Sequence, residues 1–290
     1  MLLISERGFG ADMEAPPGAM VCRGCHLERY VSYALTRHSM ESDPRTPAAQ
    51  GGCVACHSGG WAHVNAGGGR GVGGIVNPAS KELSPEKANA VCLNCHEGGK
   101  RMEWSLSKHA NRDLKCITCH QVHNMRGRDP VRERATQAQV CISCHKDRRA
   151  QINLPHRHPI PEGKVACSDC HNPHGSAGPS MMARDSVNET CYTCHMEKRG
   201  PFIHTHQPVQ EDCSTCHDPH GTTNPALLKI RVPFLCQSCH EPGNHQHNLA
   251  QLGGDFWSNN FEARGCLNCH TQIHGTNNPS PSIVNRWLWR

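Results

Sequence analysis

Long apolar segments and aromatic side chains are both scarce in this sequence of 290 residues. No run approaches the 18 or more apolar residues that a membrane-spanning helix needs, so we expect no part of the polypeptide to cross a bilayer in contact with lipid. Aromatic residues make up 4% of the chain, and the hydrophobic share of 36% includes all 20 cysteines. This is little material for an ordinary packed core. We therefore expect something other than side chains to fill the interior.

Two further signals are missing. Residues 1–20 contain no apolar stretch long enough for a secretory signal, which predicts either that a signal has been removed or that the start is misplaced. The formal charge is +5, but no run of Lys and Arg alternates with aromatic residues as a nucleic-acid platform would. The sequence therefore predicts no nucleic-acid partner.

No cysteine lies outside a C-x-x-C pair. All ten pairs are followed directly by histidine, and disulfides, zinc and covalent haem compete to explain them. With 23 histidines in the chain, ten matches out of ten arise by chance on the order of 10^-11, and neither disulfides nor zinc requires that histidine. C-x-x-C-H is the attachment signature of c-type haem, in which two thiols bind the vinyl groups and the histidine meets the iron. We therefore predict ten covalently attached haems c.

The ten motifs are numbered I to X in chain order. Their predicted attachment residues are Cys22, Cys25, Cys53, Cys56, Cys92, Cys95, Cys116, Cys119, Cys141, Cys144, Cys167, Cys170, Cys191, Cys194, Cys213, Cys216, Cys236, Cys239, Cys266 and Cys269. The predicted proximal iron ligands are His26, His57, His96, His120, His145, His171, His195, His217, His240 and His270. Subtracting two propionates for each haem from +5 gives a formal charge of about −15 for the loaded molecule.

The remaining histidines can supply the opposite face of each iron, with three to spare. They are His38, His63, His109, His123, His156, His158, His174, His204, His206, His220, His245, His247 and His274. In CSDCHNPHG (167–175) and CSTCHDPHG (213–221) the second histidine lies about one helical turn beyond the proximal one, on the same side of that porphyrin. We therefore predict that His174 and His220 bind a different haem, with Pro173 and Pro219 limiting their movement.

The layout of motifs and spare histidines repeats along the chain. Each odd-numbered motif is followed by a spare histidine, an even-numbered motif and a trailing histidine, which gives five two-haem modules over 22–63, 92–123, 141–174, 191–220 and 236–274. Odd-numbered motifs begin 70, 49, 50 and 45 residues apart, as in repeat architectures. We expect a linear array in which each module contacts mainly its neighbours.

This regular placement predicts a second set of iron ligands, called distal here. They are His38, His63, His109, His123, His158, His174, His206, His220 and His274. Within the pairs 156/158, 204/206 and 245/247, one histidine is surplus and the residues alone leave the choice open. The nine methionines show no matching period, so we expect low-potential, six-coordinate haems with imidazole on both faces.

The predicted fold class is a multihaem cytochrome c, with mostly loops and short α-helices around a linear array of ten haems, elongated, and with little or no β-sheet. Ser84 and Pro85 predict a helix start before motif III. The predicted parts are a tail (1–21), an N-terminal pentahaem half (22–150) and a C-terminal pentahaem half (151–290). Residues 66–78 (AGGGRGVGGIVNP) predict a flexible spacer, or else a contact surface for a partner.

Two more segments suggest surface roles. Residues 129–138 (DPVRERATQA) predict a solvated helical face with alternating charge. Trp287 and Trp289, near the C-terminal end, predict either a docking role or packing onto the last haem.

The stretches VCLNCH, CITCHQVH, CSDCHNPHGS, TCYTCHMEKRGP, CSTCHDPHG and CLNCHTQIHG with its NNPS tail resemble the MtrA/DmsE/PioA family of decahaem c-type cytochromes, from Cys22 to Arg290. The resemblance implies distal ligands at His158, His206 and His245 within the three pairs, with His156, His204 and His247 left without an assigned role. It also implies a non-catalytic periplasmic electron conduit, with the N-terminal haem toward the periplasm and the C-terminal haem toward the outer surface.

The partners that the resemblance implies are an MtrB-like outer-membrane β-barrel porin, an extracellular multihaem cytochrome or reductase, and a periplasmic or inner-membrane donor cytochrome. Membrane contact would then be made only through the porin. One rival hypothesis is a reductase of a small oxyanion, which needs a haem with an open iron position. Another is a cytochrome filament, which needs haems exposed to the next subunit at both ends.

Overall fold

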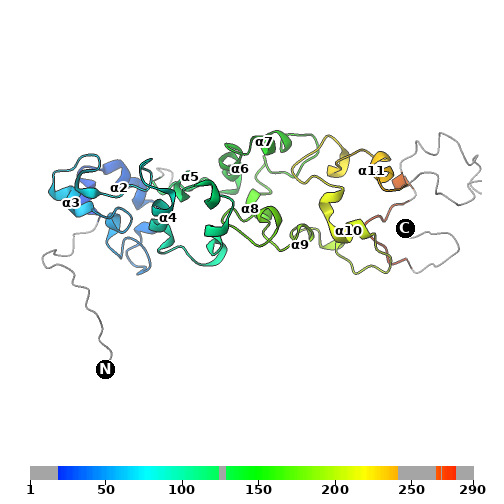
Figure 1. The fold of residues 1–290 in the computed structure, drawn as a ribbon, viewed down its shortest axis with the longest axis horizontal. Coiled ribbons are helices and arrows are strands. Elements are labelled where there is room, and N and C mark those ends of the chain that lie inside the picture. Colours follow the sequence, from blue (N-terminus) through cyan, green and yellow to red (C-terminus); the bar gives the residue numbers. More distant parts are fainter. Residues whose placement is uncertain (1–18, 124–128, 241–265, 269, 279–290) are drawn as a thin grey trace, which may run out of the picture. The chain divides into compact units, whose positions relative to one another are not determined.

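The structure is a computed structural model that describes residues 19–123, 129–240, 266–268 and 270–278. Short helices are joined by long loops (Figure 1). The α-helices are α1 (Met20–Arg23), α2 (Leu27–Ala34), α3 (Gly60–Asn65), α4 (Pro85–Leu93), α5 (Cys116–Cys119), α6 (Arg134–Ile142), α7 (Lys146–Gln151), α8 (Cys167–Cys170), α9 (Val187–Tyr192), α10 (Gln207–Glu211) and α11 (Phe234–Gln237).

Single turns of 3₁₀ helix lie between the α-helices. They are η1 (Arg37–Ser39), η2 (Gly52–Ala55), η3 (Val72–Gly74), η4 (Gly99–Arg101), η5 (Trp104–Leu106), η6 (Ala110–Arg112), η7 (Pro179–Met181), η8 (Met196–Lys198), η9 (Cys213–Thr215), η10 (Pro225–Leu227) and η13 (Cys266–Asn268). The described ranges contain isolated β-bridges but no strand. The predicted class, helices and loops without a sheet, is confirmed.

The chain forms two compact units. The first unit comprises Met1–Glu97 and Asp113–Arg132, and the second comprises Gly98–Arg112 and Glu133–Arg290. The predicted tail, the two pentahaem halves and the linear arrangement of the modules stay predictions. Within the part of the chain that the structure describes, no helix has the length and apolar character to span a membrane.

Odd-numbered and even-numbered motifs occupy different kinds of helix. The first cysteine of each odd-numbered motif lies in α1, α4, α6, α9 or α11, near the end of a helix that leads to it. The predicted start of α4 is confirmed, since Ser84 accepts a hydrogen bond from the Lys87 N–H and Pro85 is its first residue. Each even-numbered motif is itself a single turn, in η2, α5, α8, η9 or η13.

All ten motifs share one backbone geometry. The N–H of each proximal histidine donates to the carbonyl of the first cysteine, four residues earlier, over 2.8–3.1 Å. One helical turn therefore brings the first cysteine and the histidine of each motif onto one face. This is the arrangement that a porphyrin attached at the sulfurs and bound by the imidazole requires.

Buried amide side chains join the two motifs of a module. Asn188, in α9, is 6% exposed; it donates to the carbonyls of Val209 and Gln210 and accepts from the N–H of Cys213 at 2.7 Å. Asn89 of α4 does the same with Leu114 and Cys116. Helices α4 and α9 thus each fix the start of the even-numbered motif that follows.

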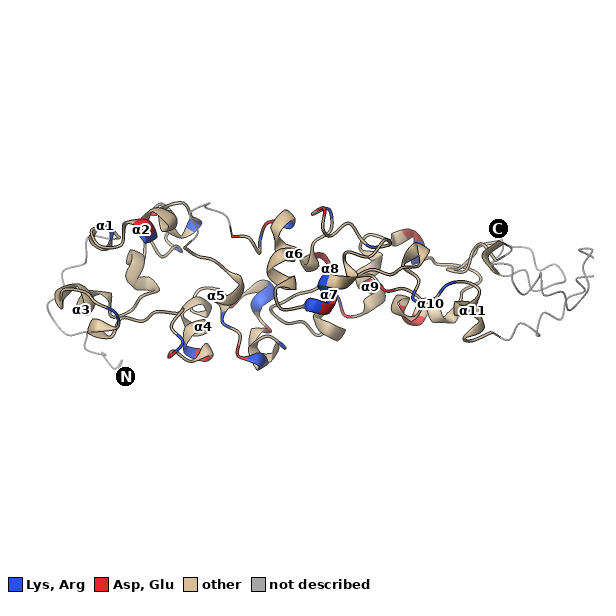
Figure 2. Ribbon diagram, turned by 90° about the horizontal axis from the view of Figure 1, so that it is seen from above, with Lys and Arg blue, Asp and Glu red and all other residues tan. Residues whose placement is uncertain are grey.

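Side chains form only a small core in the described ranges. One buried cluster combines Ala138 and Ile142 of α6 with Ile152 and Ile160. Many large apolar side chains elsewhere in the described ranges are exposed, among them Leu106 at 81% and Phe234 at 64%. Acidic and basic residues lie close together along helices such as α7 (Figure 2). The packing agrees with an interior that side chains alone do not fill.

The segment 129–138 differs from its prediction as a solvated helical face. Helix α6 begins at Arg134 rather than at Asp129, and its residues Gln137 and Ala138 are buried at 8% and 5% exposure. Asp129 itself is drawn inward to a histidine, as described below. The charge pattern misled because alternating charges do not reveal which side of a short helix a neighbouring motif covers.

Candidate haem sites

Cysteine sulfurs of the two motifs of a module lie together. The first cysteines interact in all five modules, as in the hydrogen bonds between Cys92 and Cys116 and between Cys191 and Cys213. The hydrogen bond between the thiols of Cys92 and Cys116 lowers the pKa of Cys116 to about 7 and raises the pKa of Cys92. No disulfide forms among the described cysteines. In each of the five two-motif modules expected from the sequence, the two motifs therefore lie next to each other at their first cysteines.

Histidines from distant parts of the sequence face one another in eight pairs. The pairs are His26 with His63, His96 with His38, His57 with His123, His145 with His109, His195 with His158, His171 with His220, His240 with His206, and His217 with His274. Each joins one predicted proximal histidine to one predicted distal histidine, and each lies within one compact unit. The sequence had left the matching of the two sets open.

The separation of these rings is nearly constant. Ring centroids are 6.0–6.3 Å apart in all eight pairs, although the angle between ring planes ranges from 6° to 61°. Rings in direct contact would change their separation with their angle. Two metal–imidazole bonds of ~2.1 Å plus the distance from each nitrogen to its ring centre span about this width. The rings therefore stand where one iron between them requires.

The described residues give no support to zinc. They contain no group of three or more His, Cys, Asp and Glu side chains arranged to hold a metal ion, whereas structural zinc takes four protein ligands. The repeated element is a pair of imidazoles, one on each side of a gap, with two cysteine sulfurs beside one of them. That donor set fits a c-type haem.

Burial favours the neutral form of several of these imidazoles. Desolvation is the main cause that lowers the pKa values of His38, His123, His171, His206, His220 and His274. A neutral imidazole keeps a nitrogen lone pair, which a metal ligand needs. The protein environment thus favours the neutral imidazole, which can bind a metal, over the protonated imidazolium.

Neighbouring modules exchange distal histidines in both directions. The histidine after motif I faces motif III, while the one after motif IV faces motif II. The same exchange joins motifs V and VI to VII and VIII, and motifs VII and VIII to IX and X. His220 therefore faces His171 and not the adjacent His217, as its spacing predicted. Only His63 pairs within its own module among the eight pairs.

The prolines of the paired motifs orient distal histidines through their carbonyls. Nδ1 of His109 donates to the carbonyl of Pro173 over 2.8 Å, and Nδ1 of His158 donates to that of Pro219 over 2.8 Å. Each proline directly precedes another predicted distal ligand. A ring whose Nδ1 carries the proton presents Nε2 to a metal, so these bonds select the tautomer as well as the ring orientation.

Proximal histidines of even-numbered motifs have acceptors of their own. Nδ1 of His171 lies 3.2 Å from the carbonyl of Ser180, and Nδ1 of His217 lies 2.8 Å from that of Ala226, nine residues later in both motifs. His57 uses the carbonyl of Val76 at 2.9 Å. These acceptors leave no trace in the sequence, because any residue type supplies a carbonyl.

The glycine-rich segment 66–78 folds back on α3 rather than forming a spacer. The carbonyl of Val72, in η3, lies 3.1 Å from Nδ1 of His63, and the N–H of Val76 donates to the carbonyl of Ser58 over 2.8 Å. Gly73 has φ +73°, and a Cβ there would overlap backbone atoms of His63. Glycine is needed because only a bare backbone can approach α3 so closely.

Some predicted residues stand outside these eight pairs. His156 and His204 form backbone bridges with the buried Thr222 and Thr276, which gives both a structural role. His120, His174 and His270 are in none of these eight pairs, and the ligand roles of all the predicted histidines stay predictions. The residues His245, His247, Cys269, Trp287 and Trp289 lie outside the described ranges.

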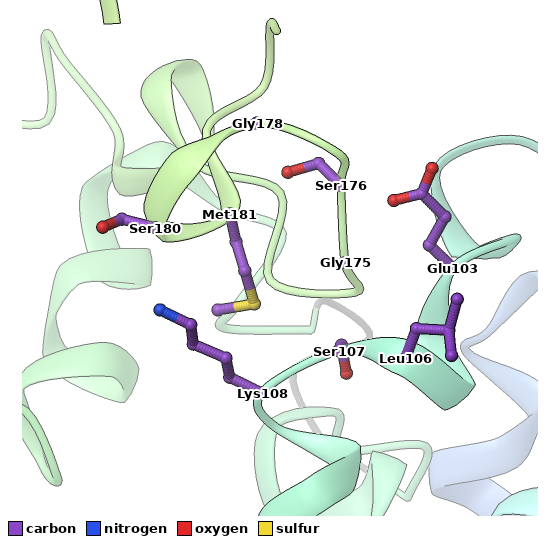
Figure 3. A pocket seen from close by; sticks show the side chains of 9 residues that line it. All are labelled: Glu103, Leu106, Ser107, Lys108, Gly175, Ser176, Gly178, Ser180 and Met181. Atoms are coloured by element: carbon purple, nitrogen blue, oxygen red, sulfur yellow. The ribbon is translucent and has the colours of Figure 1, made fainter. Parts of the chain in front are cut away.

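A pocket in the second unit is lined by several polar side chains (Figure 3). Its lining includes Lys108, next to His109, and Ser180, whose carbonyl faces His171. The buried hydroxyl of Ser176 has no hydrogen-bond partner in the structure. An ammonium and an unsatisfied hydroxyl can bind an anionic group, but the carboxylate of Glu103 also lines this pocket.

Comparisons with known proteins agree with this geometry. The profile described as doubled CXXCH motif matches residues 158–200 and 206–245, and the profile described as cytochrome c-type protein NrfB-like matches residues 53–132. The chain is 43% identical to the multiheme cytochrome MtrA of Shewanella baltica (strain OS185), over 97% of this chain and 85% of that protein.

Proposed function

The chain belongs to the MtrA-type family of multihaem c-type cytochromes, and we propose that it conducts electrons between the periplasm and the cell exterior along ten haems, each held by two of its own histidines. Electron transfer by covalently attached c-type haems follows from the family and the ten motifs. When bound, the haem irons supply one-electron chemistry.

The chain's residues attach, ligate and orient the cofactors. The twenty cysteines of the motifs would hold the vinyl groups, and the ten proximal and ten distal histidines named above, including His245, would occupy both faces of each iron. The observation that carries this proposal is the constant 6.0–6.3 Å separation of the eight imidazole pairs. An iron with imidazole on both faces has no open position for a substrate, which supports a carrier rather than an oxyanion reductase.

Exchange of ligands between modules supports a relay along the chain. Because the first and second modules, the third and fourth, and the fourth and fifth exchange histidines in both directions, the haems of these neighbours would be fixed to one another by short stretches of backbone. We propose that the N-terminal haem receives or delivers electrons in the periplasm, that an MtrB-like outer-membrane porin encloses the array, and that an extracellular multihaem cytochrome or reductase and a periplasmic or inner-membrane cytochrome are its redox partners.

The conduit can be tested in two steps. Protein purified with its haems should contain ten haems per chain and bind neither nitrite nor carbon monoxide; one binding site per chain would favour the reductase. Detergent extracts of outer membranes should then yield a complex of the chain with a porin.

Conduction itself needs the complex in a membrane. In liposomes that carry the complex and enclose an oxidised dye, an impermeant reductant added outside should reduce the dye. The matched control is a complex whose chain carries Cys167→Ala and Cys170→Ala and therefore lacks haem VI. Equal rates in the two preparations would refute conduction through the array.

A further inference from the structure

One proximal histidine donates to a carboxylate instead of a carbonyl. Nδ1 of His120, in motif IV, lies 2.6 Å from Oδ2 of Asp129, and the two side chains are 34% and 16% exposed. The other oxygen of Asp129 accepts from the backbone N–H of Val131 at 3.3 Å and lies 3.5 Å from the N–H of Gln121. The carboxylate is therefore held in place against the ring.

The position of Asp129 makes motif IV the exception in a repeated arrangement. Asp129 lies nine residues after its histidine, as Ser180 and Ala226 do in motifs VI and VIII, where neutral backbone carbonyls take the same role. Two other carboxylates approach predicted ligands in the second unit but lie farther away. Glu197 is 3.7 Å from Nδ1 of His195 and Asp218 is 3.4 Å from Nδ1 of His220.

A carboxylate acceptor changes how strongly an imidazole donates to a metal. A hydrogen bond to an ionised acceptor is shorter and stronger than one to a carbonyl, and it draws the Nδ1 proton away from the ring. The ring becomes a more basic ligand, and the nearby negative charge favours the more positive ferric iron over the ferrous iron. Both effects lower the reduction potential of the haem that the ring binds.

We propose that Asp129 lowers the reduction potential of the haem attached at Cys116 and Cys119 below the potentials of the other even-numbered haems whose proximal histidines donate to carbonyls. The inference rests on the proposed function, because it takes His120 as an iron ligand. Asp129 acts as a positioning residue, since it reaches the iron only through the ring. The ten-haem array would then contain a built-in low-potential step at haem IV.

The test is a redox titration of Asp129→Asn followed by haem absorbance. Asparagine keeps an acceptor but removes the charge, so about one tenth of the absorbance change should move to higher potential. A tenfold loss of preference for the ferric form corresponds to ~59 mV for one electron. Asp129→Glu, which keeps the carboxylate, should titrate like the parent. Asp129→Ser is a second neutral variant in case Asp129→Asn loads poorly, and it should shift in the same direction.

Two controls separate the possible causes. Glu86→Gln removes an exposed carboxylate of α4 in the same compact unit and should leave the titration unchanged. Neutral variants that keep ten low-spin haems yet titrate like the parent would overturn the inference and leave the proposed function intact. An equal shift in Glu86→Gln would overturn it as well. A parent protein with fewer than ten low-spin haems would instead count against the proposed function.

Discussion

Replacing His220 with Met tests the exchange of ligands between modules. His220 follows motif VIII by three residues but faces His171 of motif VI, with centroids 6.1 Å apart and planes inclined by 6°. Methionine is flexible enough to fill the site and offers a thioether to the iron. The substitution should convert one haem of ten, haem VI, from two imidazoles to histidine and methionine, and raise its potential.

The magnitude follows from the pairing. One tenth of the bis-imidazole signal in near-infrared magnetic circular dichroism should be lost, and the haem count should stay at ten. The identity of the altered haem comes from a double-mutant design. In a background without haem VI (Cys167→Ala, Cys170→Ala) His220→Met should cause no further loss, because its partner iron is gone. In a background without haem VIII (Cys213→Ala, Cys216→Ala) it should still remove one signal.

The opposite pattern would refute the pairing. A loss that persists without haem VI and vanishes without haem VIII would mean that His220 binds the haem of its own motif. His220 would then have to reach the far face of haem VIII, although its one-turn spacing places it on the same face as His217.

The remaining predictions concern the supports of the array. Gly73→Ala should displace His63 and make one haem high-spin, because the left-handed backbone costs alanine ~1–2 kcal/mol and the added Cβ overlaps α3. Gly71→Ala, at a similar φ but with open space around the added Cβ, should keep ten low-spin haems. Asn188→Ala should lower stability by about 1–3 kcal/mol in thermal unfolding, since buried groups around Cys213 lose their partner, whereas Asn153→Ala at an exposed site should have little effect. Electron paramagnetic resonance should resolve two classes of low-spin haem. One class is motifs III, V and VII, whose paired rings are inclined by 52–61°, and the other is motifs I, II, VI, VIII and IX, whose rings are inclined by at most 26°. A single class would contradict the ring geometry.

The sequence predicted the cofactor and the fold class because covalent haem attachment depends on residue types at fixed spacing. The C-x-x-C-H motif fixes its own local turn, so ten identical backbone bonds could be expected from ten identical motifs. The thin core could also be expected from composition. These features depend on short stretches of chain and need no knowledge of distant contacts.

Which distal histidine faces which proximal histidine could not be read from the sequence. The spacing of His220 excluded its own haem but did not say whether the partner lay in the preceding or the following module. The structure shows both directions, since His158 faces a later motif and His220 an earlier one. The paired histidines of different modules are dozens of positions apart in the sequence, so local periodicity could not predict which of them meet.

The hydrogen-bond acceptors of the histidines and the role of the glycine-rich segment could not be predicted from the sequence, for two different reasons. Carbonyl acceptors such as that of Pro219 leave no mark in residue identity, and the glycine-rich segment was expected to be a spacer or a contact surface because glycine signals both freedom and close approach. Asp129 did leave a mark, at the same nine-residue distance from its histidine as Ser180 and Ala226.

The central claim is that every iron is bound by imidazole on both faces. Near-infrared magnetic circular dichroism of the ferric protein, scaled to its haem content, measures this directly because it reports the axial ligands of low-spin haem. We expect ten bis-imidazole haems per chain and no other ligand set. A signal from high-spin or histidine–methionine haem amounting to one haem per chain would contradict it.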